Sequence, residues 1–413
     1  MAPALAIAGA IAACAAVWCG AARANQLVTI TVPDRHGEIP AKWLDYYHGE
    51  PRANVLLPDN YNPRRRYPLL VLLHGLNGDY ASYAHAGDLV VFKGFPGIVV
   101  MPEGADGWYA DWWNGGERAD PAWESYELNE VLPAVLARYR ILPQRRYHAI
   151  AGISMGGLGA AYLGGRVPGF FGSVASLSGF VDPQYFAVIA DPAMGFLSNA
   201  QQNGDSNWDP VYGPPYGFYA TGHNPTALAM NLKQTRVFVS TGNGQPSSDE
   251  MKQLTLSTAA TSCVDPAAGT CYTGDWVTES EIIEAMSERY HDALVADGVD
   301  VTYEVQPGGH DDPHFRRELK AMLDWGLFKP VVAHSNAWVN ETVASSGKLW
   351  DVAYRFAKPP TAVVQFRQVG RSLSIGAAGS AVTLTTSGGC VIETPTPATI
   401  EVPKRSCRRE RRR

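Results

Sequence analysis

The chain has 413 residues, of which 46% are hydrophobic, and a formal net charge of −6 at pH 7. This length is enough for a large hydrophobic core and for about two domains. The mild acidity points away from nucleic acid as a partner, because proteins that bind nucleic acid usually carry a basic surface.

Residues 1–24 predict a secretion signal rather than a part of the fold. Positions 4–17 are almost all alanine, isoleucine and other small apolar residues, and Ala22-Arg23-Ala24 has the small-x-small pattern of a cleavage site. The apolar run is short for a membrane anchor, which is the alternative, and no later stretch is long and apolar enough to cross a bilayer. We therefore expect a mature chain that begins at Asn25 and is secreted or stays in the cell envelope.

Four cysteines follow this segment, and an even number in an exported chain favours disulfides. Because each pair lies within one short segment, we expect Cys263 to pair with Cys271 and Cys390 with Cys407. No Cys-x-x-Cys pattern or cluster of histidine and cysteine has metal-ligand spacing, so the sequence predicts no metal site.

From Val28 to about Phe328, strand and helix patterns alternate along the chain. Such alternation predicts a doubly wound, mostly parallel α/β sheet covered by helices on both faces. Ligands of such sheets bind beyond the carboxyl ends of the strands. The expected strands are apolar runs at 69–73, 97–101, 147–150, 173–177, 236–240 and 301–305, and the expected helices span 123–139, 280–296 and 315–325.

Two stretches between these elements are candidates for contact with a ligand. Residues 107–113, which include Trp108, Tyr109 and Trp112, fit the lining of an acyl or sugar pocket and ordinary packing over the sheet equally well. Residues 181–223 have little periodicity and are too long for a plain connection, so we expect them to cover the substrate. Their aromatic residues favour packing over disorder: Trp208, Tyr212, Tyr216, Phe218 and Tyr219.

After Lys329 the pattern changes to short strands joined by Gly, Ser and Pro turns, at 362–366, 372–375, 381–385 and 399–402. This pattern predicts a small all-β appendage of the sandwich kind. Residues 404–413 are nearly all basic, and a solvated tail is favoured over contact with an anionic envelope surface. The predicted organisation is a signal at 1–24, an α/β domain at 25–330, a β-rich domain at 331–403 and a basic tail.

The chemistry of this chain is concentrated around Gly152-Ile153-Ser154-Met155-Gly156, a Gly-x-Ser-x-Gly pattern directly after an apolar run. This pattern places a serine nucleophile on a sharp strand-to-helix turn, where only small residues fit two positions on either side. Met155 begins the helix, so its free backbone N–H can stabilise an oxyanion. The pattern alone is equally compatible with a glycine-rich turn, and its position between strand and helix favours the nucleophile.

A serine nucleophile needs a base, and in this type of fold the order along the chain is serine, acid, histidine. His310 follows the last expected strand, on the loop Pro307-Gly308-Gly309, and is therefore the predicted base. His314 is the nearest rival, displaced into the start of a helix. The remaining histidines after Ser154 lie in the aperiodic stretch, in a helix and beyond the α/β region: His223, His291 and His334.

The acid that orients the base has several candidates after the strand at 236–240. Glu279 lies four and seven residues before Ile283 and Met286 of the apolar helix face and so points toward the core, whereas Glu281 falls on the solvent side. We choose Glu279, while Glu281 and Asp249 (the latter nearer the strand end, beside Glu250) remain open.

A second oxyanion donor is expected on the loop after the early central strand. His74-Gly75-Leu76-Asn77-Gly78 is that loop, and its glycines allow the Leu76 N–H to face the serine beside that of Met155. A simple strand-end turn is the alternative interpretation.

Together these residues resemble the esterase branch of the α/β-hydrolase superfamily, which includes esterase-D-like enzymes and the secreted mycolyltransferases. The resemblance covers about 28–328 and implies serine acyl-enzyme chemistry without a metal or cofactor, completed by a glutamate near the start of the late helix. Counting back from Ala296-Asp297-Gly298 places that glutamate at Ser280, one residue from Glu279 and from Glu281. The matching segments are His-Gly-Leu at 74–76, Trp-Tyr-Ala-Asp-Trp at 108–112, Gly-Ile-Ser-Met-Gly-Gly at 152–157, Ser-Leu-Ser-Gly-Phe at 176–180, Gly-Asn-Gly at 242–244 and Gly-His at 309–310.

The chain departs from the mycolyltransferases in two segments that bear on sugar recognition. Their Asp-Gly-Leu-Arg loop reads His74-Gly75-Leu76-Asn77 here, and their tryptophan-containing segment after the histidine reads Asp311-Asp312-Pro313-His314-Phe315. The sequence therefore predicts a secreted serine esterase that acts on an acyl ester or lipid. An acyltransferase is the nearest alternative, and a non-catalytic protein that binds the cell envelope is the alternative from another class.

Overall fold

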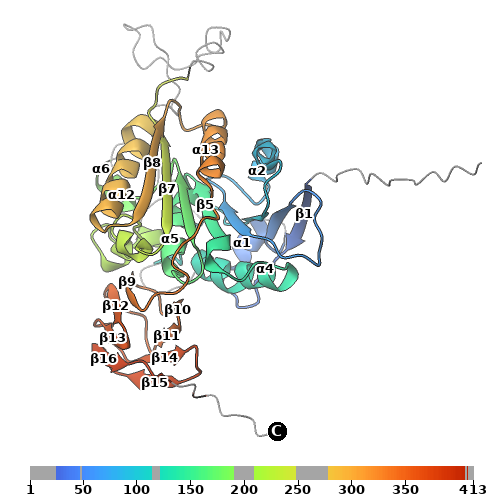
Figure 1. Cartoon of the computed structure of the whole chain (residues 1–413). Helices are drawn as coiled ribbons and strands as arrows, with labels where there is room; N and C mark the ends of the chain where they lie inside the picture. The colour runs from blue at the N-terminus through green and yellow to red at the C-terminus, as the bar shows by residue number, and fades with distance from the viewer. Residues whose placement is uncertain are drawn as a thin grey trace, which may run out of the picture.

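The computed structural model describes residues 25–46, 49–113, 121–189, 209–247, 278–404 and 407. Its larger part is an eight-stranded sheet with the order β1-β2-β4-β3-β5-β6-β7-β8 (Figure 1). The pairs β1–β2 and β2–β4 are antiparallel, and every other neighbouring pair is parallel. The strands are β1 (Gln26–Thr31), β2 (Arg52–Leu57), β3 (Leu69–Leu73), β4 (Ile98–Pro102), β5 (His148–Ile153), β6 (Ser173–Leu177), β7 (Arg236–Gly242) and β8 (Asp300–Gln306).

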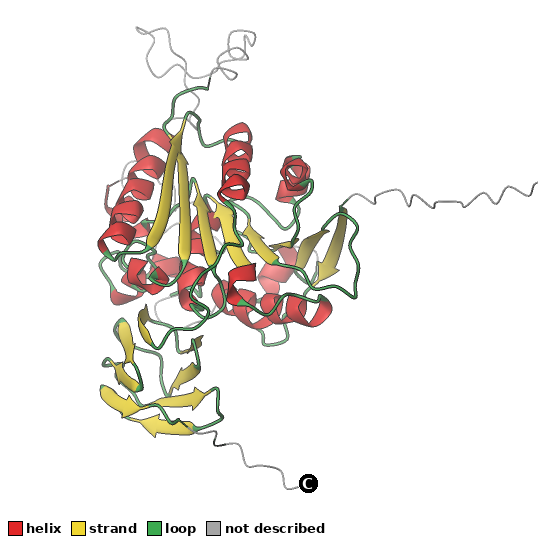
Figure 2. Cartoon of the chain, viewed as in Figure 1, coloured by secondary structure: helices red, strands yellow, loops and turns green. Residues whose placement is uncertain are grey.

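Helices cover both faces of this sheet (Figure 2). Side chains alternate across a strand, so Leu69 and Leu73 of β3 face one apolar core and Leu70 and Leu72 face the other. The first core packs against α3 (Trp123–Tyr126), η3 (Glu127–Val131), α4 (Leu132–Arg138), α5 (Met155–Arg166), η7 (Glu279–Ile283) and α12 (Glu284–Ala296). The second packs against α2 (Ser82–His85), η1 (Asp88–Phe92) and α13 (Asp312–Trp325).

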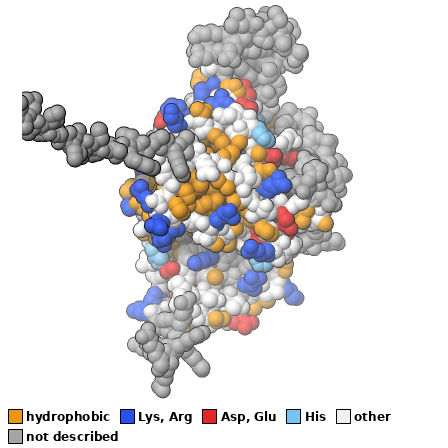
Figure 3. All heavy atoms as spheres, turned by 90° about the vertical axis from the view of Figure 1, so that its right-hand side faces the viewer, with side chains coloured by type: hydrophobic (Ala, Val, Ile, Leu, Met, Phe, Trp, Pro, Cys, Tyr) orange, Lys and Arg blue, Asp and Glu red, His pale blue; other side chains and the backbone are white. Residues whose placement is uncertain are grey.

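The remaining helices are short and lie in the connections between strands. They are α1 (Ala41–Tyr46), η4 (Arg145–Tyr147), α6 (Pro183–Ile189), α8 (Asp209–Tyr212), α9 (Phe218–Thr221) and η6 (Ala229–Leu232). In the described residues no helix has both the length and the apolar character that a membrane span requires. On the face that carries β1 and α2, hydrophobic side chains gather near the middle, with lysine and arginine side chains around them (Figure 3).

All six predicted strands and all three predicted helices of the α/β part are present, within a few residues at their ends. The antiparallel strands β1 and β2 were not predicted. β1 is an edge strand and mostly solvent-exposed, so it has no continuous apolar run. β2 carries the buried Asn54, whose side chain accepts a hydrogen bond of 2.6 Å from Thr29 of β1.

The C-terminal region forms two four-stranded antiparallel sheets, β10-β11-β14-β15 and β16-β13-β12-β9, around one apolar core. The sequence predicts β12, β13, β14 and β16 but misses the other four strands, whose exposed faces carry polar residues that interrupt the apolar pattern. The bounds are β9 (Ala337–Thr342), β10 (Ser346–Leu349), β11 (Val352–Phe356), β12 (Val364–Val369), β13 (Ser372–Ile375), β14 (Val382–Thr386), β15 (Val391–Thr394) and β16 (Ala398–Glu401).

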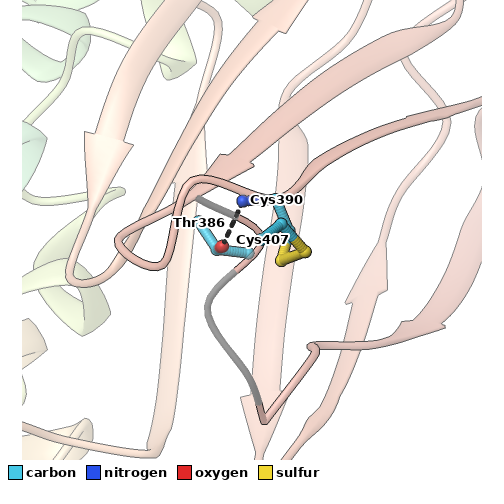
Figure 4. Close-up of a disulfide and its surroundings, with 3 residues drawn as sticks. All are labelled: Thr386, Cys390 and Cys407. Atoms are coloured by element: carbon cyan, nitrogen blue, oxygen red, sulfur yellow. Dashed lines mark hydrogen bonds between the residues drawn. A yellow bond between two sulfur atoms is a disulfide. The ribbon is translucent and has the colours of Figure 1, made fainter. Parts of the chain in front are cut away.

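A disulfide between Cys390 and Cys407 ties the end of the chain to the turn between β14 and β15 (Figure 4). The backbone N–H of Cys390 donates to Oγ1 of Thr386 over 3.1 Å, and that of Cys407 donates to the carbonyl of Gly388 over 2.9 Å. This pair is one of the two that the sequence predicts. The predicted signal at 1–24, the pair Cys263–Cys271 and most of the basic tail lie outside the described residues.

A buried ion pair lies at the end of α5, where its arginine also contacts the C-terminal sheets. Nε of Arg166 lies 2.5 Å from Oε1 of Glu124, while its Nη1 lies 3.2 Å from the hydroxyl of Tyr354 and its Nη2 lies 3.3 Å from the carbonyl of Ser346. Burial alone would raise the pKa of Glu124. The positive charge of Arg166 and then the contacts with His223 and Tyr162 outweigh burial and lower this pKa to about 2.

The substitution Arg166→Met is therefore expected to lower the free energy of unfolding by about 3–5 kcal/mol, because it removes the guanidinium that neutralises a buried carboxylate. Since the folded pKa of Glu124 is depressed from 4.5 to about 2, its contribution is complete above pH 4.5 and is lost as the pH falls toward 2. Urea unfolding of wild type and variant between neutral pH and pH 3 measures both effects. A loss below about 1 kcal/mol at neutral pH would contradict the expectation.

Candidate active site

Ser154 lies on a strained turn between β5 and α5, with φ of 56° and ψ of −119°. A positive φ is unfavourable for a residue with a Cβ and holds the side chain out of the turn. A Cβ on Gly152 would collide with the carbonyl of Gly156, and one on Gly156 would collide with the carbonyl of Leu73. The small residues of the Gly-x-Ser-x-Gly pattern are thus required by the close approach of α5 to β3 and β5.

The structure brings together the three side chains that the sequence predicts as nucleophile, base and acid. Nε2 of His310 lies 2.9 Å from Oγ of Ser154, and Nδ1 of His310 lies 2.7 Å from Oε2 of Glu279. Ser154 is partly exposed, the His310 side chain is 17% exposed and Glu279 is fully buried. The row therefore runs from the surface of a cavity into the interior, as proton transfer from a hydroxyl to an oriented imidazole requires.

The loop that carries His310 is held against the end of β7. The backbone N–H of Asn243 donates to Gln306 over 3.0 Å, and that of Gly244 donates to Gly308 over 2.9 Å. The ring of Phe315 meets the His310 ring edge to face, with 5.0 Å between the ring centroids. These contacts fix the imidazole between its two partners.

Glu279 begins the π-helical turn η7 and accepts hydrogen bonds on both carboxylate oxygens. Its Oε1 accepts from the hydroxyl of Ser178 over 2.7 Å, from the hydroxyl of Thr241 over 2.8 Å and from the N–H of Gly242 over 2.6 Å. Burial alone would raise the pKa of Glu279. The hydrogen bond and charge of His310, followed by the Ser178 hydrogen bond, hold it below its ordinary value.

The rivals considered from the sequence do not lie in this row. Glu281 is exposed, and Asp249 and Glu250 lie outside the described residues. His314 is fully buried, and its Nε2 lies 3.6 Å from Glu318 rather than beside Ser154.

The sequence assigned no role to three donors of Glu279, although Ser178 and Gly242 fall within its Ser-Leu-Ser-Gly-Phe and Gly-Asn-Gly segments. Those segments were the signal that could have revealed Ser178 and Gly242, because Ser178 follows a central strand and Gly242 ends one at the edge where His310 lies. Thr241 stands one residue before its segment. Their role as hydrogen-bond donors can be recognised only from their distance to Glu279, and the sequence does not contain that distance.

Leu76 and Met155, the predicted oxyanion donors, both line the same cavity as Ser154. A Cβ built on Gly75 would lie 3.4 Å from Cβ of Ser154, so the loop passes directly beside the nucleophile. Within the described residues, the N–H groups of Leu76 and Met155 donate no backbone hydrogen bond, which leaves both available.

The loop of Leu76 is clamped by the segment that follows β4. The N–H of Asn77 donates to Asp106 over 2.6 Å, and the N–H of Gly104 donates to Nε2 of His74 over 3.0 Å. The hydroxyl of Tyr109 donates to the carbonyl of His74 over 3.1 Å. These bonds hold the loop in position before any substrate binds.

Ser154 opens into a cavity of about 670 Å³. Trp108 and Phe180 form one wall, with 5.2 Å between their ring centroids. Polar groups, among them Asn77, lie elsewhere on the lining. The other apolar lining residues include Phe186, Ile282, Ile283 and Phe315. A cavity of this size and character suits the apolar acyl part of a small ligand.

Both aromatic stretches noted in the sequence divide between lining and packing. Trp108 lines the cavity, whereas Trp112 is buried against Trp43, with 5.8 Å between ring centroids. From 181–223, Phe186 lines the cavity, while Tyr212 and Tyr219 pack around His223. Tyr216 is 82% exposed, and Trp208 lies outside the described residues.

One group of side chains in the described part of the chain has an arrangement that could hold a metal ion. The ligand atoms of His36, Glu38 and Glu130 all lie within 4.8 Å of one another. Nδ1 of His36 lies 2.6 Å from Oε1 of Glu130, and none of the three residues lines the cavity at Ser154. This group therefore takes no part in the site.

Residues 46–325 match the family model described as "Putative esterase". The chain belongs to this family. It is 31% identical over 229 residues to the esterase Rv1288 of Mycobacterium tuberculosis. This alignment covers 52% of this chain and 48% of that protein. It is 28% identical over 177 residues to the diacylglycerol acyltransferase/mycolyltransferase Ag85C of Mycobacterium leprae, which covers 39% of this chain and 51% of that protein. The chain thus aligns with about half the length of these curated relatives.

Two solved structures share the fold. MPT51 of Mycobacterium tuberculosis matches with a TM-score of 0.53 and 20% identity, over 74% of this chain and 99% of that one. FphF, a fluorophosphonate-binding serine hydrolase of Staphylococcus aureus, matches with a TM-score of 0.50 and 16% identity, over 74% and 99%. The predicted α/β-hydrolase fold and the predicted resemblance to the esterase branch are confirmed.

Proposed function

We propose that this chain is a serine esterase that hydrolyses carboxylic esters through an acyl-enzyme intermediate on Ser154. The observation that carries the proposal is the continuous hydrogen-bonded row of Ser154, His310 and Glu279 at the wall of an apolar cavity. Membership of the esterase family supports the same chemistry.

In the proposed reaction, Oγ of Ser154 attacks the ester carbonyl carbon while its proton passes to Nε2 of His310. Glu279 accepts the Nδ1–H bond and stabilises the imidazolium. The N–H groups of Leu76 and Met155 bind the oxyanion. The tetrahedral intermediate collapses, the C–O bond to the alcohol breaks, and the alcohol leaves with the proton from Nε2. Water, deprotonated by His310, then releases the acid and regenerates Ser154.

The substrate class that we propose is an ester with an apolar acyl group, which Trp108, Phe180 and Phe186 would hold. Transfer of the acyl group to a sugar or lipid hydroxyl is the second candidate, favoured by the likeness to a mycolyltransferase. Hydrolysis is preferred because both ring nitrogens of His74 are already occupied, by Gly75 and by Gly104, and so neither can hold a sugar hydroxyl.

The proposal also includes export of the chain and a function for each of its regions. Residues 1–24 have the pattern of a cleavable signal, and a disulfide such as Cys390–Cys407 is typical of oxidising compartments. We assign catalysis to 25–330 and describe 331–403 as a β-rich domain. Apart from Cys407, which the disulfide ties to Cys390, we favour a solvated tail for 404–413 over a contact with the envelope surface.

The test is to incubate the purified protein with p-nitrophenyl esters of increasing chain length and with a fluorophosphonate probe. We expect turnover, and a single label on the peptide that contains Ser154, because only an activated serine reacts with the probe. A labelled acyl donor with and without trehalose distinguishes hydrolysis from transfer through the appearance of a glycolipid. Neither label nor turnover with any ester would favour the non-catalytic alternative and overturn the proposal.

A further inference from the structure

A second buried carboxyl group lies directly behind the predicted acid. Glu318 of α13 is fully buried, as is Ser178 at the end of β6. Oγ of Ser178 lies 2.7 Å from Oε1 of Glu279 and 2.9 Å from Oε2 of Glu318. One hydroxyl therefore bridges two acids in the interior of the protein.

The number of protons in this bridge limits the charge that it can carry. A serine hydroxyl has one proton and can donate to only one of the two carboxyl groups. If both acids were ionised, a lone pair of Ser178 would face an anion, and two negative charges would share one buried site. A second proton on one of the acids removes this conflict, because that acid then donates to Ser178.

The partners of the two acids indicate which of them holds the second proton. Glu279 accepts from His310, Thr241 and Gly242 in addition to Ser178, which favours its ionised form. Apart from the bridge, Glu318 has two polar partners in the described part of the chain, the N–H of Ser178 at 3.1 Å and Nε2 of His314 at the longer distance of 3.6 Å. The acid with fewer donors is the one that a buried site keeps neutral.

The ring of His314, on the same helix, lies between Arg317 and Glu318. Nη2 of Arg317 lies 3.3 Å from Nδ1 of His314, and because a guanidinium only donates, Nδ1 accepts and the ring proton is on Nε2. That Nε2 faces Oε1 of Glu318 at 3.6 Å. Burial lowers the pKa of His314 and Arg317 opposes a second ring proton, but the charge of Glu318 and its contact with the ring raise this pKa above its ordinary value overall. Tyr83 of α2, another titratable neighbour, donates its hydroxyl proton to the carbonyl of Leu73.

We propose that Glu318 acts as a positioning residue in the form of a neutral carboxylic acid. Its Oε2–H donates to Ser178, whose hydroxyl donates to Oε1 of Glu279, so that Oε2 of Glu279 is directed at Nδ1 of His310. This proposal rests on the proposed function of Ser154, His310 and Glu279 and adds a residue that no part of the sequence analysis assigned to the site.

The experiment compares Glu318→Gln with Glu318→Leu. The amide of glutamine can still donate to Ser178, so Glu318→Gln should keep kcat within about threefold and leave the acid limb of the pH–rate profile in place. Leucine cannot donate, so Glu318→Leu should lower kcat by about 10–100-fold while KM changes less than about twofold. Asp324→Asn, an acid-to-amide change at an exposed position of the same helix, is the matched control.

Two results would overturn the proposal. An acid limb that moves down by more than about half a pH unit in Glu318→Gln would mean that Glu318 is an anion that stabilises the imidazolium. A wild-type kcat in Glu318→Leu would mean that the bridge does not position Glu279. If Glu318→Leu does not fold, Ser178→Ala takes its place and should show the same loss of kcat. Because wild type and Asp324→Asn are assayed in parallel, loss of the proposed function itself would appear as inactivity of these two proteins.

Discussion

Ser154→Ala is expected to lower kcat for ester hydrolysis by about 10⁵–10⁶-fold and to abolish fluorophosphonate labelling. The reason is that Oγ of Ser154 is the atom within 2.9 Å of Nε2 of His310 on the wall of the cavity, and water cannot be held there with the same geometry. The cavity and both oxyanion N–H groups stay in place, so substrate affinity should change little. Steady-state kinetics with the best ester of the panel measures the loss.

Ser82 offers a matched control, because it also lines the cavity but its hydroxyl is engaged with Asp79. Ser82→Ala should keep the label and most of the turnover. If Ser154→Ala kept more than about 1% of the wild-type kcat, or if Ser82→Ala abolished labelling, the assignment of the nucleophile would be wrong.

Glu279→Gln is expected to lower kcat by about 10³–10⁴-fold with little change in folding. Three donors converge on Oε1 of Glu279, so the amide oxygen of glutamine must occupy that side. Its NH₂ group then faces Nδ1 of His310 and donates to it. This interaction places the ring proton on Nε2, where it points at Ser154, and the imidazole can no longer accept the serine proton.

Glu281→Gln is the control for this substitution, since Glu281 lies on the same turn and is exposed. We expect wild-type kinetics from it, together with an unchanged pH–rate profile. A larger loss of kcat from Glu281→Gln than from Glu279→Gln would mean that Glu281, and not Glu279, is the acid.

The sequence located the turn at Ser154 and the loop at His310 correctly because the constraints on both are local. At Gly152 the Gly-x-Ser-x-Gly pattern avoids a collision with the carbonyl of Gly156, four residues away, and His310 follows the last parallel strand by four residues. The central strands were equally clear, since burial on both faces demands a continuous apolar run. The antiparallel strands β1 and β2 and half of the C-terminal strands were missed, since one polar face or a buried Asn54 interrupts that run.

The acid was harder to select because its position depends on the phase of a helix. The count from the end of α12 reached Ser280, and the structure has a π-helical turn at Glu279–Ile283. A π-helical turn holds about one residue more than an α-helical turn, which is the size of that offset. The direction of the apolar face selected Glu279, the residue that the structure places beside His310.

By itself, then, the sequence determined the fold class, the strained serine turn and the histidine loop, because short-range sterics and the burial pattern of single strands specify them. Only the tertiary structure decided which groups surround Glu279. Ser178 follows β6, Thr241 and Gly242 end β7, and Glu318 lies in α13. Only the parallel order of β6, β7 and β8 brings these segments to one edge of the sheet. Hydrogen bonds act over about 3 Å in space, and no pattern along the chain records that distance.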